Sequence, residues 1–562
     1  MKSFIIDKYI KFGKRFLFIF VCMLYLTSCN IDDTLNTSPM DRISDDALWK
    51  DKALIETFIT NTYRIIPNGF RYSFYNLSII SDELNARQNA WAWAAIAGNM
   101  TPDDLGQVDF WTSNDTPTNT NRNYWKTINQ VNIFLQKIED VPNNVDAATK
   151  NRMVGEMKAI RAFSYFNLIS LFGGVPLITK PFALDDDFMV PRNSYKEVMD
   201  FVLSELEESI GLLPLEYDSQ NKGRVTKGAA MAIKARALLY RASPLNNPEN
   251  DIQKWKDAAN AAKAIIDLNK YSLFPDYRTL FLEENIYNSE AIWQRPYNQL
   301  ITKEAAYIEL SSYPNGYNGF GQIHPIQNLV DDYETIRGLL PENDPQYDPQ
   351  NPYVDRDPRF YASILHDGMF WKGREVETFL PGGKDSNEGP VSGWNATQTG
   401  YYPRKFCNER IDNPSGSNMS QTPYTWFRYA EVLLNYAEAS YFLGDEVTAR
   451  EYVNMVRKRP SVNMPEITES GEALFKRIVN ERRIELVFEQ HRWFDIRRLK
   501  IAPQVMNEDF TRMKITKKPD GTKTYEILLW KEVNFKEPRD YLLPIPQSEI
   551  EKNSLLEQNP GY

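Results

Sequence analysis

Apolar residues recur at helical spacing along most of this 562-residue chain. Residues 195–213 and 227–242 each show such a pattern, and Thr226 can cap the second of these segments at its start. Residues 428–443 show it best, and Gly444 follows as a C-terminal cap. One side of this last helix carries an apolar set made of Ala430, Leu433, Leu434, Ala437 and Tyr441. The pattern predicts a mainly helical, all-α protein.

Small residues accompany these apolar stripes, and helices joined by short turns follow each other in pairs. Ala258, Ala262 and Ile265 line one such helix, and Ala449 and Val453 line another. Small and apolar residues at these offsets resemble the tetratricopeptide repeat, in at least three helix pairs. Generic antiparallel helix packing explains the same spacing and stays open as an alternative.

Residues 280–423 have a different composition. They are rich in Gly, Pro, Asn, Asp and Tyr and show few helical stripes. We expect a loop-rich, irregular subdomain inserted between the helix pairs. Loops on a rigid scaffold are where binding residues concentrate, so the aromatic residues of this block are ligand candidates. They are Tyr313, Tyr317, Phe320, Trp371 and Trp394.

Residues 477–500 combine apolar and charged positions without any Gly or Pro, which predicts one uninterrupted helix. Its apolar residues surround the helix, so it is expected to be buried. Glu481, Glu485 and Glu489 recur one turn apart, and buried carboxylates require cationic partners. One interpretation makes Glu481 and Glu485 an acid/base pair. We favour the other, a salt-bridged structural hub, because paired charges on a central helix are commonly architectural.

The N-terminus has the features of a targeting segment. Residues 1–28 begin with several lysines and contain the apolar run 16–26, which is too short to span a bilayer. The sequence Leu-Thr-Ser that precedes Cys29 resembles a bacterial lipobox, so Cys29 is expected to be lipidated and to begin the mature chain. Residues 29–40 would form the tether. The alternative is an ordinary signal peptide with an incidental Cys. If Cys29 is lipidated and Cys22 is removed with the signal peptide, Cys407 has no disulfide partner.

Net charge, aromatic content and the spacing of His and Cys limit which ligands this protein can be expected to bind. The formal net charge of −10 argues against nucleic acid or anionic lipid as the main partner. Aromatic residues reach 13%, a surplus that suits a surface stacking on sugar-like ligands. The three His and three Cys lie far apart and form no zinc motif. We therefore predict no metal site and no cofactor.

Residues 81–99 supply the side-chain types that a sugar needs. A sugar ring offers an apolar face for an aromatic platform and a rim of hydroxyls for polar groups. The alternative is that the two tryptophans in this stretch are core anchors under a loop. The candidate ligand residues are Asp82, Arg87, Trp91, Trp93 and Asn99.

Several motifs in order resemble one known family, the SusD/RagB outer-membrane lipoproteins of Bacteroidetes. The resemblance covers nearly the whole chain. Its motifs are the lipobox at Cys29, Ser-Asp-Glu at 81–83, Phe-Gly-Gly-Val-Pro-Leu at 172–177, Gly-Arg-Val-Thr-Lys at 223–227, Arg-Tyr-Ala-Glu-Val-Leu-Leu at 428–434, Glu-Arg-Arg-Ile-Glu-Leu at 481–486, Arg-Trp-Phe-Asp at 492–495, and the terminal Pro-Ile-Pro at 544–546 with Gln-Asn-Pro-Gly-Tyr at 558–562.

The resemblance implies four tetratricopeptide-like helix pairs that form a right-handed scaffold. It assigns residues 41–279 and 424–562 to N- and C-terminal helical regions around the inserted block 280–423. It implies a lipid-anchored protein of the cell outer membrane, facing the exterior, that captures oligosaccharides for polysaccharide utilisation. The expected partner is a SusC-like TonB-dependent transporter, and no enzymatic activity is expected. The alternatives are a RagB-like peptide-binding uptake lipoprotein and a surface glycoside hydrolase that uses Glu481 and Glu485.

Overall fold

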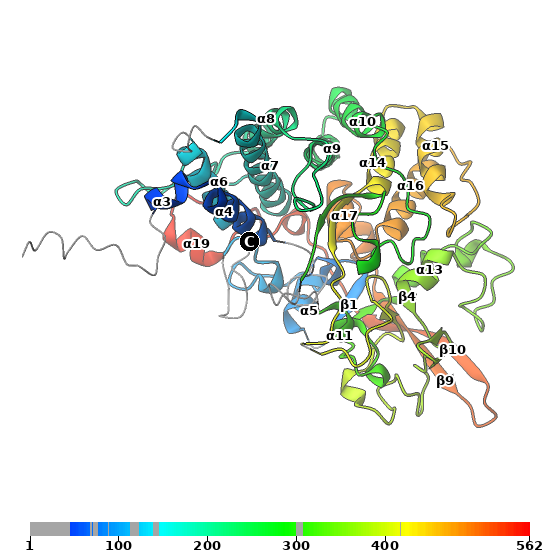
Figure 1. Cartoon of the computed structure of the whole chain (residues 1–562). Coiled ribbons are helices and arrows are strands. Elements are labelled where there is room, and N and C mark those ends of the chain that lie inside the picture. The colour runs from blue at the N-terminus through cyan, green and yellow to red at the C-terminus, as the bar shows by residue number, and fades with distance from the viewer. Residues whose placement is uncertain are drawn as a thin grey trace, which may run out of the picture. The chain divides into compact units, whose positions relative to one another are not determined.

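The computed structural model describes residues 45–67, 70, 77–87, 89–112, 123–138, 145–298, 307–415 and 417–562 (Figure 1). The predicted signal peptide, tether and lipidation site at Cys29 lie outside these residues. The chain divides into a small unit, residues 1–58 with 139–145, and a large unit that holds the remainder. In the described part of the small unit, the indole of Trp49 packs on Phe58 at 5.1 Å. Two separate helices, α3 (Asp45–Lys50) and α4 (Lys52–Arg64), lie in this part of the chain.

Helices dominate the large unit, so the all-α prediction is confirmed. Successive helices pack on one another along the chain. α10 also packs on α14, although the loop-rich block separates the two helices in sequence (Figure 1). Thr226 accepts a hydrogen bond from the Ala229 amide and caps α9, as predicted. These helices are α6 (Tyr124–Lys137), α7 (Ala147–Phe172), α8 (Tyr195–Leu212), α9 (Lys227–Ala242), α10 (Ile252–Ile266), α14 (Tyr429–Phe442), α15 (Glu446–Arg457) and α16 (Gly471–Glu485).

Short helices and two-stranded sheets make up the loop-rich block and its neighbours. The helices are α5 (Ala90–Ile96), α11 (Ile308–Ser312), α12 (Gln327–Asp331), α13 (Pro358–Ser363), α18 (Ala502–Val505) and α19 (Gln547–Lys552). The five strand pairs among the described residues are antiparallel. They are β1 (Leu84–Ala86) with β3 (Ile323–Pro325), β2 (Ala291–Arg295) with β8 (Tyr424–Arg428), β4 (Ile364–Leu365) with β7 (Tyr402–Pro403), β5 (Phe370–Trp371) with β6 (Arg374–Glu375), and β9 (Phe510–Lys517) with β10 (Lys523–Lys531).

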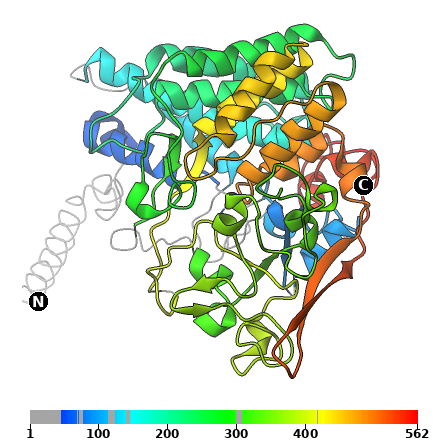
Figure 2. The same ribbon diagram turned by 90° about the vertical axis from the view of Figure 1, so that its right-hand side faces the viewer.

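The β9–β10 hairpin lies beside the loop-rich block, although the two are far apart in sequence (Figure 2). A bridge joins Leu380 to Thr516, and the Met513 amide donates to the Thr399 carbonyl. The register of β1 on β3 sets Asn85 opposite His324. These pairings bring residues near 85, 325, 398 and 513 into one part of the large unit.

Residues 477–500 do not form one helix, which corrects the prediction. α16 ends at Glu485, and α17 (His491–Arg498) begins after a five-residue turn. Phe488 and Gln490 have φ angles of 62° and 70°, the left-handed region that side chains rarely adopt. Tertiary contacts hold the turn: the Phe488 amide donates to Glu83 and the Gln490 side chain accepts from the Leu77 amide. Helix propensity is overridden here by partners far away in sequence.

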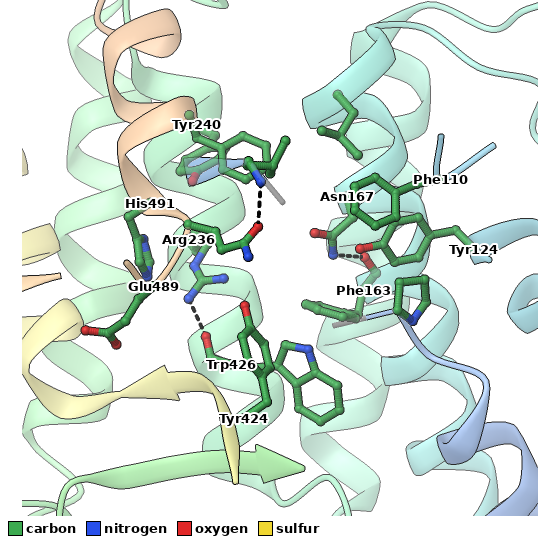
Figure 3. A pocket seen from close by; sticks show the side chains of 15 residues that line it. Phe110, Tyr124, Phe163, Asn167, Arg236, Tyr240, Tyr424, Trp426, Glu489 and His491 are labelled. Carbon is green, nitrogen blue, oxygen red and sulfur yellow. Dashed lines mark hydrogen bonds between the residues drawn. The ribbon is translucent and has the colours of Figure 1, made fainter. Parts of the chain in front are cut away.

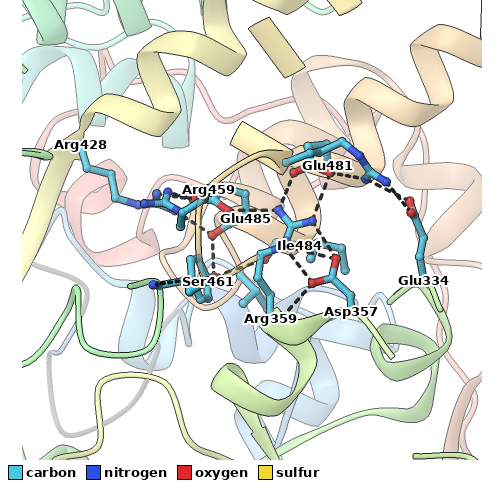
Figure 4. A network of polar contacts seen from close by, with 12 residues as sticks. Glu334, Asp357, Arg359, Arg428, Arg459, Ser461, Glu481, Ile484 and Glu485 are labelled. Atoms are coloured by element: carbon cyan, nitrogen blue, oxygen red, sulfur yellow. Dashed lines mark hydrogen bonds and ion pairs between the residues drawn. The ribbon is translucent and has the colours of Figure 1, made fainter. Parts of the chain in front are cut away.

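The carboxylates of this region are buried and ion-paired (Figure 4). Glu485 lies 2.7 Å from both Arg428 and Arg459. Glu481 pairs with Arg457 at 2.9 Å and also with Arg359. We call this network, Glu481, Glu485 and Glu489 with Arg359, Arg428, Arg457, Arg459 and Lys405, the ionic hub. It joins α15, α16, α13 and β8, which are distant in sequence.

Candidate functional site

Asp82, a predicted ligand residue, is part of the protein interior. It is 2% exposed. Its carboxylate lies 2.6 Å from Arg483 and 2.7 Å from Arg492. Burial alone would raise the pKa of Asp82, but the two guanidinium groups outweigh burial and hold the pKa below its usual range. Asp82 therefore ties the segment before β1 to α16 and α17, and its carboxylate oxygens are already occupied.

Tyr313 and Trp371 are also buried, at 0% and 1% exposure. Their rings meet edge to face at 4.8 Å, and Tyr317 meets Trp371 in the same way at 4.6 Å. The half-buried Tyr317 donates its hydroxyl to the Trp371 carbonyl at 2.8 Å, and the Arg374 guanidinium covers its ring at 3.9 Å. These three predicted residues form an aromatic core of the loop-rich block rather than an open platform.

Trp91 and Trp93 lie on α5, so they point to different sides of a helix. Asn89 caps this helix by accepting from the Ala92 amide. The Trp91 ring covers Gly106, where an added Cβ would come within 2.2 Å of the indole. The Trp93 indole donates to the Ala86 carbonyl at 2.9 Å, at the end of β1. Both tryptophans are half-buried.

Arg87 and Trp394 meet on the surface, although 307 positions separate them. Trp394 is 69% exposed, and the Arg87 guanidinium lies 5.6 Å from its ring centroid. Arg87 Nη2 donates to the Asn395 side chain at 3.0 Å. The loop that carries Trp394 turns tightly: Ser392 has a φ of 35°, and a Cβ at Gly393 would meet a carbonyl at 2.3 Å. This geometry holds an aromatic face, a cation and an amide together at the surface.

A second aromatic group lies next to the same end of β1. Lys531 Nζ is 3.7 Å above the Trp93 ring and 5.2 Å from Trp530, so the ammonium lies against two indoles. Arg512 also covers Trp530, at 5.2 Å. Lys531, Trp530 and Asn395 were not predicted from the sequence. Nothing in the spacing of the chain connects residue 531 with residue 93, because tertiary contacts bring them together, among them the hydrogen bond from the Asn534 amide to the Ile96 carbonyl.

Amide groups lie on β1 and in the loop after Trp394. The Asn85 side chain donates to Gln398 at 3.5 Å, while its own oxygen is buried without a hydrogen-bond partner among the described residues. His324, opposite Asn85, is buried, and burial lowers its pKa to about 3, so the imidazole is neutral. Asn99, exposed at the end of the α5 segment, accepts from Lys536 at 3.4 Å. We define the platform site as Arg87, Trp93, Trp394, Asn395, Trp530 and Lys531.

A small cavity lies among α7, α9 and α17 (Figure 3). Arg236, Glu489 and His491 face it from one side, and Asn167 and Tyr124 face it from the other. Its volume is about 60 Å³, room for a few water molecules and too little for a sugar ring. Ligand pockets are generally several times larger, so this cavity is not the ligand site.

A wider groove lies on the helical body. It is formed by α6, the segment 176–190 and α19, and its volume is about 730 Å³. Phe182 and Phe188 on its wall are 39% and 57% exposed. No predicted site residue lines it. None of the described helices is long and apolar enough to cross a membrane, and no described His, Cys, Asp or Glu group could hold a metal ion.

Known proteins resemble this chain over nearly its whole length. The model of the SusD family matches residues 280–562, and a second model, "Starch-binding associating with outer membrane", matches residues 36–239. A SusD-like protein of Formosa agariphila, P38, is 25% identical over 87% of this chain and 91% of its own length.

Solved structures give the same result. A SusD-like protein from Bacteroides fragilis is 28% identical with a TM-score of 0.79, covering 94% of this chain and 100% of that one. A SusD-like carbohydrate binding protein from the same species is 26% identical with a TM-score of 0.77, covering 91% and 100%. The predicted family and its tetratricopeptide-like helical fold are confirmed, and this chain belongs to the SusD family.

Proposed function

We propose that this protein is a non-catalytic surface lipoprotein that captures oligosaccharides at the platform site. The observation that carries the proposal is the exposed face of Trp394, with Arg87 and Asn395 held beside it. An aromatic face stacks on the apolar side of a sugar ring, while guanidinium and amide groups bind its hydroxyls. The similarity to a carbohydrate binding protein of B. fragilis supports the ligand class.

The ionic hub argues against a glycoside hydrolase built on Glu481 and Glu485. Such an enzyme needs one carboxyl group with a raised pKa as its general acid and open access to substrate. Both glutamates are buried, at 3% and 0% exposure. Burial raises their pKa, but the surrounding arginines outweigh it, so both pKa values lie below the ordinary range and both groups are ionised. Neither can donate a proton to a glycosidic oxygen.

Delivery to a SusC-like TonB-dependent transporter is the second part of the proposal, with the protein anchored to the outer membrane by a lipid on Cys29. The family description "associating with outer membrane" supports the location. Replacing Cys29 with Ser should release the protein from the membrane fraction. Affinity purification of the wild-type protein from its native membranes should retain a TonB-dependent transporter, and purification of it alone would contradict the partnership.

Calorimetry with a panel of oligosaccharides tests the capture function. Trp394→Ala should weaken binding of the best ligand about 5- to 30-fold, because about 1–2 kcal/mol of stacking is lost. Phe188→Ala is the matched control: it removes an exposed aromatic side chain from the helical groove and should leave affinity unchanged. If no oligosaccharide binds but peptides do, the RagB-like alternative replaces this proposal. Turnover of any polysaccharide by the purified protein would contradict it.

A further inference from the structure

The cations of the platform site, Arg87 and Lys531, and the neighbouring Arg512 differ from the arginines of the ionic hub, which lie beside carboxylates. Among the described residues, Arg87, Arg512 and Lys531 form no ion pair, whereas the chain as a whole carries a net charge of −10. The three side chains instead lie against the indoles of Trp394, Trp530 and Trp93. A positive charge without a counter-ion is less stable near the protein surface than a paired one, so each of these side chains can gain from an anionic ligand.

Arg87 shows the consequence most clearly. Its Nε and Nη1 atoms are buried without a hydrogen-bond partner, and only Nη2 donates, to Asn395. A buried donor without an acceptor costs about 1–3 kcal/mol, more when it is charged. Burial lowers the pKa of Arg87, and Tyr402 offsets that only in part. An anion near the Trp394 face would offset part of the cost of this desolvated guanidinium.

Lys531 is the second such group. Its ammonium is placed by Trp93 and Trp530 alone, since it makes no hydrogen bond to any other described residue. Burial lowers its pKa. The ring contacts fix its position without neutralising its charge, so the charge remains free for a ligand. Arg512 adds a third positive charge, because its guanidinium also lies against the Trp530 ring.

From this arrangement we propose that the platform site takes an anionic oligosaccharide, in which uronate carboxylates or sulfate esters lie near the charges of Arg87 and Lys531 while a sugar face stacks on Trp394. The inference rests on the proposed capture function and names its substrate class. Stacking on the aromatic faces contributes affinity for neutral and charged sugars alike. The unpaired cations supply the preference, because they gain a counter-charge only when the saccharide carries negative charge.

Matched ligand pairs test the proposal by calorimetry at 20 mM and 500 mM NaCl. One pair is oligogalacturonate and its neutral methyl ester, and the other is a sulfated galactan oligosaccharide and its desulfated form. In at least one pair the charged member should bind ten times or more tightly at low salt, and high salt should remove most of that preference. The pair that shows it tells whether the anion is a carboxylate or a sulfate.

Variants connect the preference to the named residues. Lys531→Met and Arg87→Met should each reduce the charged-over-neutral ratio at least threefold. Lys196→Met is the control, because it removes the same charge from an exposed lysine on α8, 79% exposed at its side chain, and should leave the ratio unchanged. Lys531 is half-buried and makes no hydrogen bond to another described residue, so its variant remains informative if Arg87→Met fails to fold.

The outcomes separate the two proposals. If neutral oligosaccharides bind as tightly as charged ones, and Trp394→Ala still weakens them, the anionic preference is overturned and the capture function stands. If Lys531→Met and Lys196→Met lower the ratio equally, the preference comes from net charge and the site assignment is overturned. If Trp394→Ala changes no saccharide's affinity, the capture function itself fails at this site.

Discussion

The ionic hub and the platform site use the same residue types in opposite ways. In the hub, the guanidinium groups of Arg428 and Arg459 each lie 2.7 Å from a Glu485 oxygen, deep in the protein. In the platform site, Arg87 and Lys531 lie against indole rings and meet no carboxylate among the described residues. Charge is compensated in the first region and left uncompensated in the second.

The two regions therefore differ in whether their charged groups can still bind a ligand. Charges taken from water are stable only when partners satisfy them, so a fully paired network has nothing left for a ligand. It fixes instead how α13, α15, α16 and β8 meet. An uncompensated cation beside an exposed ring keeps its capacity, at a cost in stability that the rest of the fold offsets. A segment dense in charged residues is therefore a structural network in this protein. The candidate site is marked instead by cations that form no ion pair in the folded structure.

Breaking the hub should have the largest effect. Glu485→Gln leaves Arg428 and Arg459 buried with one partner fewer, which should lower the free energy of unfolding by about 3–5 kcal/mol. Urea denaturation measures this. Asp200→Asn is the control, since it breaks the exposed pair of Asp200 with Lys196 and should cost less than about 0.5 kcal/mol. A Glu485→Gln protein that unfolds like the wild type but binds ligand poorly would contradict the division of roles.

Acid should weaken the hub next most strongly. Burial raises the pKa of Glu489, but Arg428 and Lys405 outweigh it and bring the pKa to about 2, from 4.5. A carboxyl with a depressed folded pKa stabilises the fold fully above pH 4.5, and this stabilisation is lost as pH falls toward 2. The loss is about 3 kcal/mol for this group. Unfolding followed from pH 5 to pH 2 should show it, and the loss should be smaller in Glu489→Gln.

Asp82 tests where the buried ionic contacts end and the platform site begins. It lies close in sequence to Arg87, yet its carboxylate is bound by Arg483 and Arg492. Asp82→Asn should lower the free energy of unfolding by about 2 kcal/mol, because two buried cations lose a counter-charge. Ligand affinity of the folded variant should stay within twofold of the wild type. A tenfold loss of affinity with unchanged unfolding would move Asp82 into the binding site.

Trp394→Phe should have the smallest effect. The aromatic face remains, so calorimetric affinity should fall by threefold or less, whereas Trp394→Leu, which has no ring, should fall nearly as far as the alanine variant. Equal affinities for the Phe and Leu variants would show that apolar area alone, and not ring stacking, acts at this position.

Much of the helical fold was predictable from the sequence. α8, α9 and α14 agree with the predicted segments to within a residue because their periodicity and caps are local signals. The break between α16 and α17 was not predictable, since residues 486–490 contain no Gly or Pro. The left-handed conformations of Phe488 and Gln490 depend on contacts with Glu83 and Leu77, about 400 positions earlier.

The candidate site could be foreseen only in its residue types. Arg87 and Trp394 were both named from the sequence, but that they meet depends on a loop more than 300 positions later folding over the end of β1. Tyr313 and Trp371 were named for the same aromatic character and are buried, because residue type does not tell which ring the fold leaves open. Lys531 was missed because an isolated lysine at a strand end carries no local signal.

Hydrogen exchange with and without the tightest-binding oligosaccharide shows whether the ligand binds at the platform site and leaves the ionic hub untouched. Saturating ligand should slow exchange in peptides that cover residues 84–93, 392–398 and 528–531, and should leave residues 471–498 of the ionic hub unchanged. Protection that appears in α16 and α17, or along the groove of α6 and α19, with none around Trp394, would contradict the account.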